Sequence, residues 1–84
     1  MTQNLAILKA LSFRKYHSTD LIEQARIIYK RDTSQGMSAC STNRLRELRS
    51  NGYIESEPDL LSEELEWSIT LKGREYLKQK MKVF

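Results

Sequence analysis

The sequence predicts one mainly helical domain of the α+β class, in the order helix, helix, helix, strand, strand, helix. In the first fifty residues, leucine, isoleucine and alanine recur at three- and four-residue spacing, the period of a helix buried on one face. Residues 65–70 alternate apolar and polar side chains, the period of a half-buried strand. The 84 residues, of which 39% are hydrophobic and 30% charged, suit a single small core spanning residues 1–84.

The first helix is expected over residues 4–11. Leucines recur there at every third position from Leu5 to Leu11, and two alanines add helix propensity. Residues 12–17 are then expected to form the end of this helix or a connector.

A second helix is expected to begin near residues 18–20. Ser18, Thr19 and Asp20 are all good N-cap residues, and Glu23 follows Asp20 at the spacing of a capping box. The polar segment 30–36 ends in glycine, which predicts the end of this helix and a loop.

A third helix is expected over about residues 38–50, with Ser38 as its N-cap. Leu45 and Leu48 mark the face that it buries. The dipeptide at 51–52, Asn-Gly, is a strong stop signal, because glycine tolerates the left-handed conformation that follows many helices.

The remaining chain predicts an antiparallel hairpin and a last helix. Residues 53–57 and 65–70 are the two expected strands, and the seven residues 58–64 are the loop that joins them. The last helix is expected from residue 70 or 71 through about Lys82.

Charge is distributed unevenly along the chain. Residues 1–50 carry nine Lys/Arg and four Asp/Glu, whereas residues 51–68 carry six Asp/Glu and no Lys/Arg. Residues 69–84 are basic again, and the net charge of the whole chain is +3. The basic parts are suited to a polyanion, and the acidic segment is not.

Two sequence patches resemble signatures of bacterial winged helix-turn-helix regulators. Residues 41–54, STNRLRELRSNGYI, are similar to the segment in which a Ser/Thr-rich recognition helix leads into the first wing strand. Residues 67–77, WSITLKGREYL, are similar to the Leu-Thr-x-x-Gly segment in which the second wing strand leads into a helix. The patches resemble MarR-, PadR- or ArsR-type domains. This resemblance implies a winged-helix fold and a transcriptional regulator that binds specific double-stranded DNA.

On a helical wheel, Asn43 and Arg46 point away from the face that carries Leu45 and Leu48. A helix lying in the major groove presents its N-terminal side chains to base edges, where Asn recognises adenine and Arg recognises guanine. The third helix is therefore the expected reading element.

Other basic and polar residues are expected to contact the DNA backbone. Arg44 and Arg49 lie nearer the flanks of the helix, and Ser38 lies at its start, where free amides hold a phosphate. The full set of predicted DNA-binding residues is Ser38, Thr42, Asn43, Arg44, Arg46 and Arg49. Additional backbone contacts could come from Lys9, Arg14, Lys15, Lys30 and Arg31. An alternative interpretation is that the third helix is only a solvated amphipathic helix whose arginines provide solubility. Glu47 is discordant with DNA binding: it could face a cytosine amino group, pair with a neighbouring arginine or repel a phosphate.

The acidic segment supports a different function. Six carboxylates on the wing, within residues 55–66, would be repelled by phosphates. The alternative is therefore a winged-helix protein–protein interaction module, an adaptor or inhibitor, that binds a protein partner through this wing. Leu60 and Leu61 at the tip either form a docking site or fold back onto Trp67.

Several function classes find no support. The three glycines are far apart, so no phosphate-binding loop is present, and one histidine and one cysteine cannot build a catalytic triad or a Cys/His zinc site. We expect a non-enzyme without cofactor or metal. His17 is expected to be a surface or capping residue, and Cys40 an ordinary small residue. No signal peptide or membrane span is evident, so a cytoplasmic protein is expected. A homodimer that reads two half-sites is favoured over a monomer.

Overall fold

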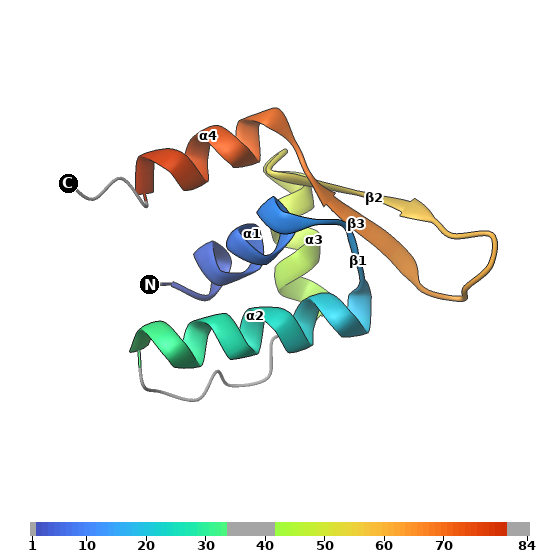
Figure 1. The fold of residues 1–84 in the computed structure, drawn as a ribbon. Coiled ribbons are helices and arrows are strands. Elements are labelled where there is room, and N and C mark those ends of the chain that lie inside the picture. The colour runs from blue at the N-terminus through green and yellow to red at the C-terminus, as the bar shows by residue number, and fades with distance from the viewer. Residues whose placement is uncertain (1, 34–41, 81–84) are drawn as a thin grey trace.

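The structure is a computed structural model that describes residues 2–33 and 42–80 (Figure 1). The elements follow in the order α1 (Gln3–Phe13), β1 (Tyr16–His17), α2 (Ser18–Thr33), α3 (Thr42–Ser50), β2 (Ile54–Pro58), β3 (Leu65–Ile69) and α4 (Leu71–Lys80). The predicted helices and hairpin are all present. Ser38, the expected cap of the third helix, and the expected end of the last helix near Lys82 lie outside the described residues.

The sheet has one strand more than the sequence predicted. Its strand order is β1-β3-β2, and both pairings are antiparallel. Tyr16 pairs with Trp67 and His17 with Glu66, within the segment expected to be a helix end or connector. A two-residue strand is too short to show the alternation of apolar and polar side chains that predicts a strand. The sequence of β1 therefore could not reveal its pairing with β3.

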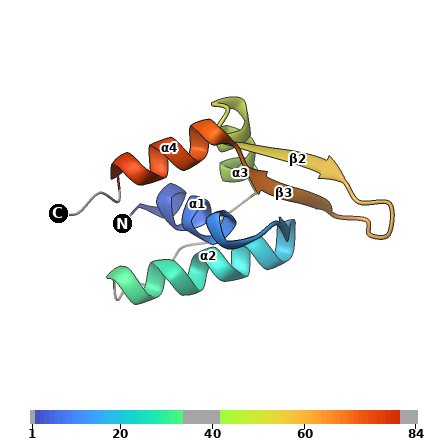
Figure 2. The same cartoon turned by 45° about the horizontal axis from the view of Figure 1, so that its top comes forward.

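The core lies where α1 passes between α2 and α4 (Figure 1). Leucine, isoleucine and alanine side chains of α1 are buried on most of its circumference, because other elements cover it on several sides. The other helices and the sheet add Leu21, Ala25, Leu45, Leu48, Ile54 and Trp67 to this core. The β2–β3 hairpin projects from the helical body as a wing (Figure 2).

The end of α3 confirms the predicted stop signal. Gly52 has a φ of +81°, the left-handed conformation that favours glycine. The Gly52 amide donates to the Arg49 carbonyl and the Tyr53 amide to the Leu48 carbonyl, both at 3.0 Å. These two bonds form a Schellman motif, which ends α3 and turns the chain directly into β2.

The start of α4 explains the second sequence patch in physical terms. The Thr70 hydroxyl accepts a hydrogen bond from the Gly73 amide at 3.0 Å, which caps the helix. The same hydroxyl donates to the Gly52 carbonyl at 2.6 Å, and the Thr70 amide donates to the Tyr53 carbonyl at 3.1 Å. A Cβ on Gly73 would lie 2.0 Å from the Tyr53 carbonyl oxygen. The Thr-x-x-Gly spacing therefore joins α4 to the beginning of the wing.

Candidate nucleic-acid interface

Helix α3 has one face buried in the core and one face exposed to solvent. Leu45 and Leu48 are buried in the core, with exposed fractions of 0% and 2%. Asn43, Arg46 and Glu47 are exposed on the outer face. The wheel therefore placed the apolar and polar faces correctly, because one buried leucine per turn fixes the rotation of a short helix.

The two flanking arginines of α3 contact neighbouring elements. Arg44 is half-buried and donates to the side-chain oxygen of Asn4, on α1, at 3.0 Å. Arg49 donates to the Ser56 hydroxyl, on β2, at 2.9 Å, and its guanidinium lies 5.5 Å from the centre of the Trp67 ring. Arg44 therefore joins α3 to α1, and Arg49 joins it to the wing. Neither partner is adjacent in sequence, so no local pattern could have predicted them.

The beginning of the predicted reading surface is only partly described. Helix α3 begins at Thr42, and its side chain, like Ser38 and Cys40, lies outside what the structure describes. Of the six predicted site residues, the structure thus brings Asn43, Arg44, Arg46 and Arg49 together on one helix of nine residues.

One carboxylate of the acidic wing bonds to β1. The Asp59 carboxylate accepts a hydrogen bond from His17 Nε2 at 2.6 Å, and the His17 and Asp59 side chains are 31% and 26% exposed. This bond raises the pKa of the His17 imidazole above its ordinary value. The pKa of Asp59 is lowered, first by the hydrogen bond from the Leu61 amide and then by the one from His17.

A second wing carboxylate caps α2. Glu64 Oε1 accepts hydrogen bonds from the Thr19 amide, at 3.0 Å, and from the Thr19 hydroxyl. These bonds lower the pKa of Glu64, and the negative charge lies at the positive end of the helix dipole. The sequence had suggested a local capping box of Asp20 and Glu23. The helix begins at Ser18, within the predicted range, and the wing supplies a cap from 45 residues away.

Three other carboxylates of the wing face solvent. Glu55, Glu57 and Glu63 are exposed. Leu60 and Leu61 are each 98% exposed, so the interpretation that they fold back onto Trp67 is wrong. Trp67 is instead covered by the body of the protein, and its indole Nε1 donates to the Ser18 hydroxyl at 2.7 Å.

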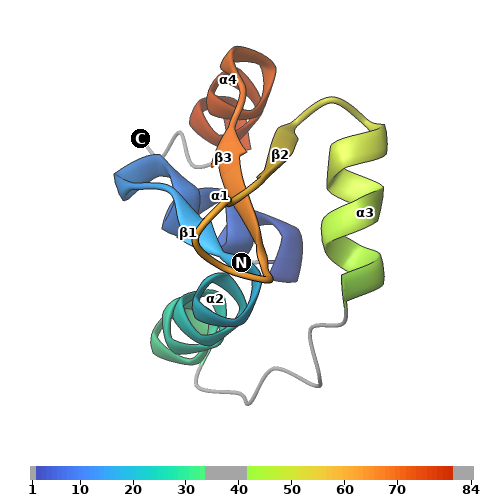
Figure 3. The same cartoon turned by 90° about the vertical axis from the view of Figure 1, so that its right-hand side faces the viewer.

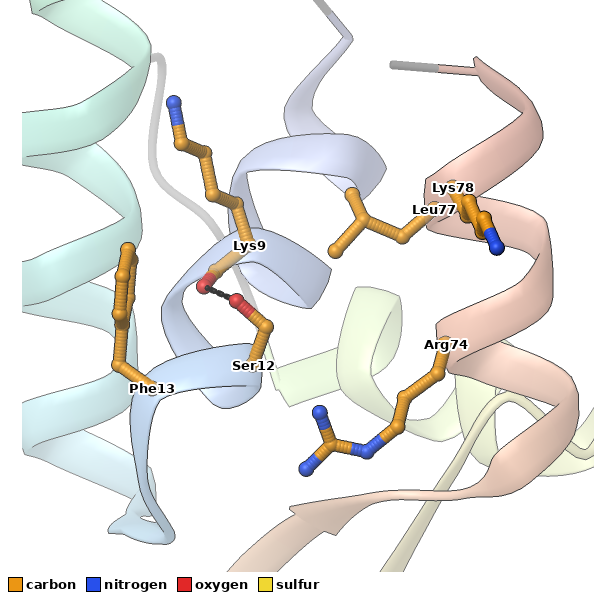
Figure 4. Close-up of a pocket in the computed structure, with 6 residues that line it drawn as sticks. All are labelled: Lys9, Ser12, Phe13, Arg74, Leu77 and Lys78. Atoms are coloured by element: carbon orange, nitrogen blue, oxygen red, sulfur yellow. Dashed lines mark hydrogen bonds between the residues drawn. The ribbon is translucent and has the colours of Figure 1, made fainter. Parts of the chain in front are cut away.

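Lys9, on α1, and Arg14 and Lys15, in the turn after it, lie in a different region. The turn after α1 is on the opposite side of the sheet from α3 (Figure 3), and Arg14 and Lys15 line a small pocket there with Arg74. A second pocket, of about 320 Å³, lies between α1 and α4 (Figure 4). Its lining residues are Lys9, Ser12, Phe13, Arg74, Leu77 and Lys78. Backbone contacts from Arg14 and Lys15 therefore belong to a surface other than the one α3 presents.

No helix in the described part of the chain has both the length and the apolar character needed to cross a membrane.

A solved transcriptional regulator shares the fold of this chain. No protein-family model matches the chain, and no curated protein sequence matches it. A solved transcriptional regulator from Clostridium thermocellum is 25% identical, with a TM-score of 0.77 over 95% of this chain and 77% of that chain. The chain therefore has the winged-helix fold found in transcriptional regulators.

Two further solved structures share this fold. RosR, solved in a complex, has a TM-score of 0.74 at 13% identity, over 98% of this chain and 70% of that chain. ZitR of Lactococcus lactis, solved as a double mutant, has a TM-score of 0.66 at 18% identity, over 98% of this chain and 51% of that chain. The fold class predicted from the sequence is confirmed, and the choice among MarR-, PadR- and ArsR-type families stays a prediction.

Proposed function

We propose that this protein is a transcriptional regulator that binds specific sequences of double-stranded DNA, with α3 in the major groove. The observation that carries the proposal is the exposed pair Asn43 and Arg46 on a helix that Leu45 and Leu48 anchor in the core. Side chains held on a rigid element can discriminate bases, because their position is fixed before DNA binds. The likeness to a solved transcriptional regulator supports the same conclusion.

Each α3 residue has a role in this proposal. Asn43 and Arg46 contact base edges, and Thr42 does so from the helix start. Arg49 contacts a phosphate from the side of the wing, and Arg44 supports the helix through Asn4 or reaches a phosphate on the other flank. Ser38 is proposed as a further phosphate contact.

The test is selection of binding sites from random duplexes, followed by anisotropy titrations at several salt concentrations. Affinity should fall with salt with a log–log slope of about −0.9 per phosphate neutralised. Arg46→Ala should cost about 1–3 kcal/mol on the selected site and relax preference at one base pair, whereas Arg49→Ala should weaken all duplexes alike. Arg26→Ala, at an exposed arginine of α2, is the matched control. Failure to select any duplex that binds in a salt-dependent manner would refute the proposal.

We propose, as a second candidate, that the wing binds a protein partner. Two adjacent leucines that are each 98% exposed, surrounded by acidic residues, favour this function. In a nuclease-treated pull-down, a wing-dependent partner should be lost on Glu63→Lys and on Leu60→Ser. Glu63 is the appropriate charge to reverse, because Glu64 also caps α2 and its reversal would perturb the fold. Retention of the partner by both variants would exclude the wing as its binding site.

A further inference from the structure

Three potential metal ligands meet between β1 and the wing. His17 lies on β1, Asp59 at the start of the wing loop and Glu66 on β3, and all three are half-buried. One ligand atom from each side chain lies within 4.8 Å of the others. These residues are up to 49 positions apart, so only the fold brings them together.

We propose that His17, Asp59 and Glu66 form a binding site for a divalent transition metal ion of the Zn²⁺ type. One imidazole nitrogen and two carboxylate oxygens are a donor set that Zn²⁺ accepts, with a water molecule as the fourth ligand. With bond lengths of about 2.0–2.2 Å, neighbouring ligand atoms of a tetrahedral ion lie about 3.3 Å apart. His17 Nε2 and Asp59 Oδ2 are 2.6 Å apart, so these two atoms must separate by roughly 0.7 Å for an ion to replace the hydrogen between them.

The backbone already holds the three ligands in place. His17 and Glu66 are direct cross-strand partners in the β1–β3 pairing, which puts their side chains on the same face. Asp59 is fixed by its other carboxylate oxygen, which accepts from the Leu61 amide at 2.9 Å. Its Oδ2 is thereby left directed at His17.

The surrounding charge also favours a cation. Glu64 is bonded to Thr19, so it does not occupy the site, but its carboxylate acts on His17 electrostatically, as Glu66 does. For Glu66, no hydrogen bond or ion pair of the carboxylate occurs among the residues that the structure describes, so the carboxylate can move toward an ion without breaking one. A bound ion would tie the wing loop to β1.

The experiment uses the full chain in a Cys40→Ser background, because Cys40 is the other strong zinc ligand in the sequence. Zn²⁺ is titrated by calorimetry at neutral pH, and the imidazole signals of His17 are followed by NMR. These signals are unambiguous, since the chain has one histidine. We expect one ion per chain, with the His17 signals shifting as the ion binds.

Substitutions separate this site from nonspecific binding. Glu66→Gln and Asp59→Asn should each raise the Kd by about tenfold or more. Glu63→Gln, at a wing carboxylate outside the cluster, is the matched control and should leave the Kd unchanged. If Asp59→Asn unfolds the wing, the Kd of Glu66→Gln decides the result. Circular dichroism without metal verifies that the Glu66→Gln variant is folded. Absence of binding, or a Kd that Glu66→Gln and Glu63→Gln change equally, would overturn the proposal.

Discussion

Replacement of Gly73 by alanine tests how α4 is joined to the wing. The new Cβ would lie 2.0 Å from the Tyr53 carbonyl oxygen and 2.8 Å from Ile69 Cγ1. An ordinary contact is longer than 3.4 Å, so the start of α4 must move away from Tyr53. That movement breaks or stretches the two hydrogen bonds that Thr70 makes to the Tyr53 and Gly52 carbonyls.

The magnitude follows from these contacts. Two lost hydrogen bonds cost about 1 kcal/mol each, and the steric strain of overpacking adds about 1–3 kcal/mol. Alanine recovers about 1 kcal/mol through its higher helix propensity. The free energy of unfolding should therefore fall by about 3 kcal/mol, and Tm by roughly 12–24 °C for a domain of this size.

Urea denaturation, followed by the fluorescence of the single tryptophan, measures the effect. Glu75→Ala, at an exposed position of the same helix, is the control and should change stability by less than about 0.5 kcal/mol. If Gly73→Ala were as stable as this control, the packing argument for the Thr-x-x-Gly patch would be refuted.

Three further predictions concern the body, the wing and assembly. Ser18→Ala should lower the free energy of unfolding by about 1–3 kcal/mol, measured by urea denaturation, because the buried indole of Trp67 loses its acceptor. In a chelator-containing buffer, the His17–Asp59 pair should stabilise the fold most between about pH 3.8 and 6.5. Because the pKa of His17 is raised, the stabilisation that the His17 cation contributes is lost as pH rises through that pKa. Because the pKa of Asp59 is lowered, the stabilisation that the Asp59 carboxylate contributes is lost as pH falls through its pKa. The Tm values of the wild type and of His17→Gln should therefore differ in this pH window and converge outside it. If the homodimer expected from the sequence uses the surface between α1 and α4, Phe13→Ser, at a side chain that is 71% exposed, should shift sedimentation equilibrium toward monomer. An unchanged mass would exclude that surface.

Much of the fold was predictable because its signals are local. The Gly52 turn and the Thr70–Gly73 cap each depend on residues a few positions apart, which a reader of the sequence can recognise. Helix periodicity likewise placed Leu45 and Leu48 inside and Asn43 outside. β1 was missed because two residues carry no period.

The site was less predictable where it depends on distant partners. Arg44 meets Asn4 across 40 positions, His17 meets Asp59 across 42, and Glu64 meets Thr19 across 45. From its composition, the wing was predicted to be acidic along its whole length. In the fold, Asp59 and Glu64 bond to the body of the protein, whereas Glu55, Glu57 and Glu63 face solvent. No property of the segment alone distinguishes these two groups.

The placement of Arg49 over the indole of Trp67 makes tryptophan fluorescence a probe of this flank of α3. The guanidinium both bonds to the wing and lies near the ring, so a phosphate that attracts it must draw it away from both. Indole emission depends on nearby charge, and the chain has only one tryptophan. Engagement of a duplex by that flank of α3 should therefore be visible as a change in intrinsic fluorescence, without any dye attached to either molecule.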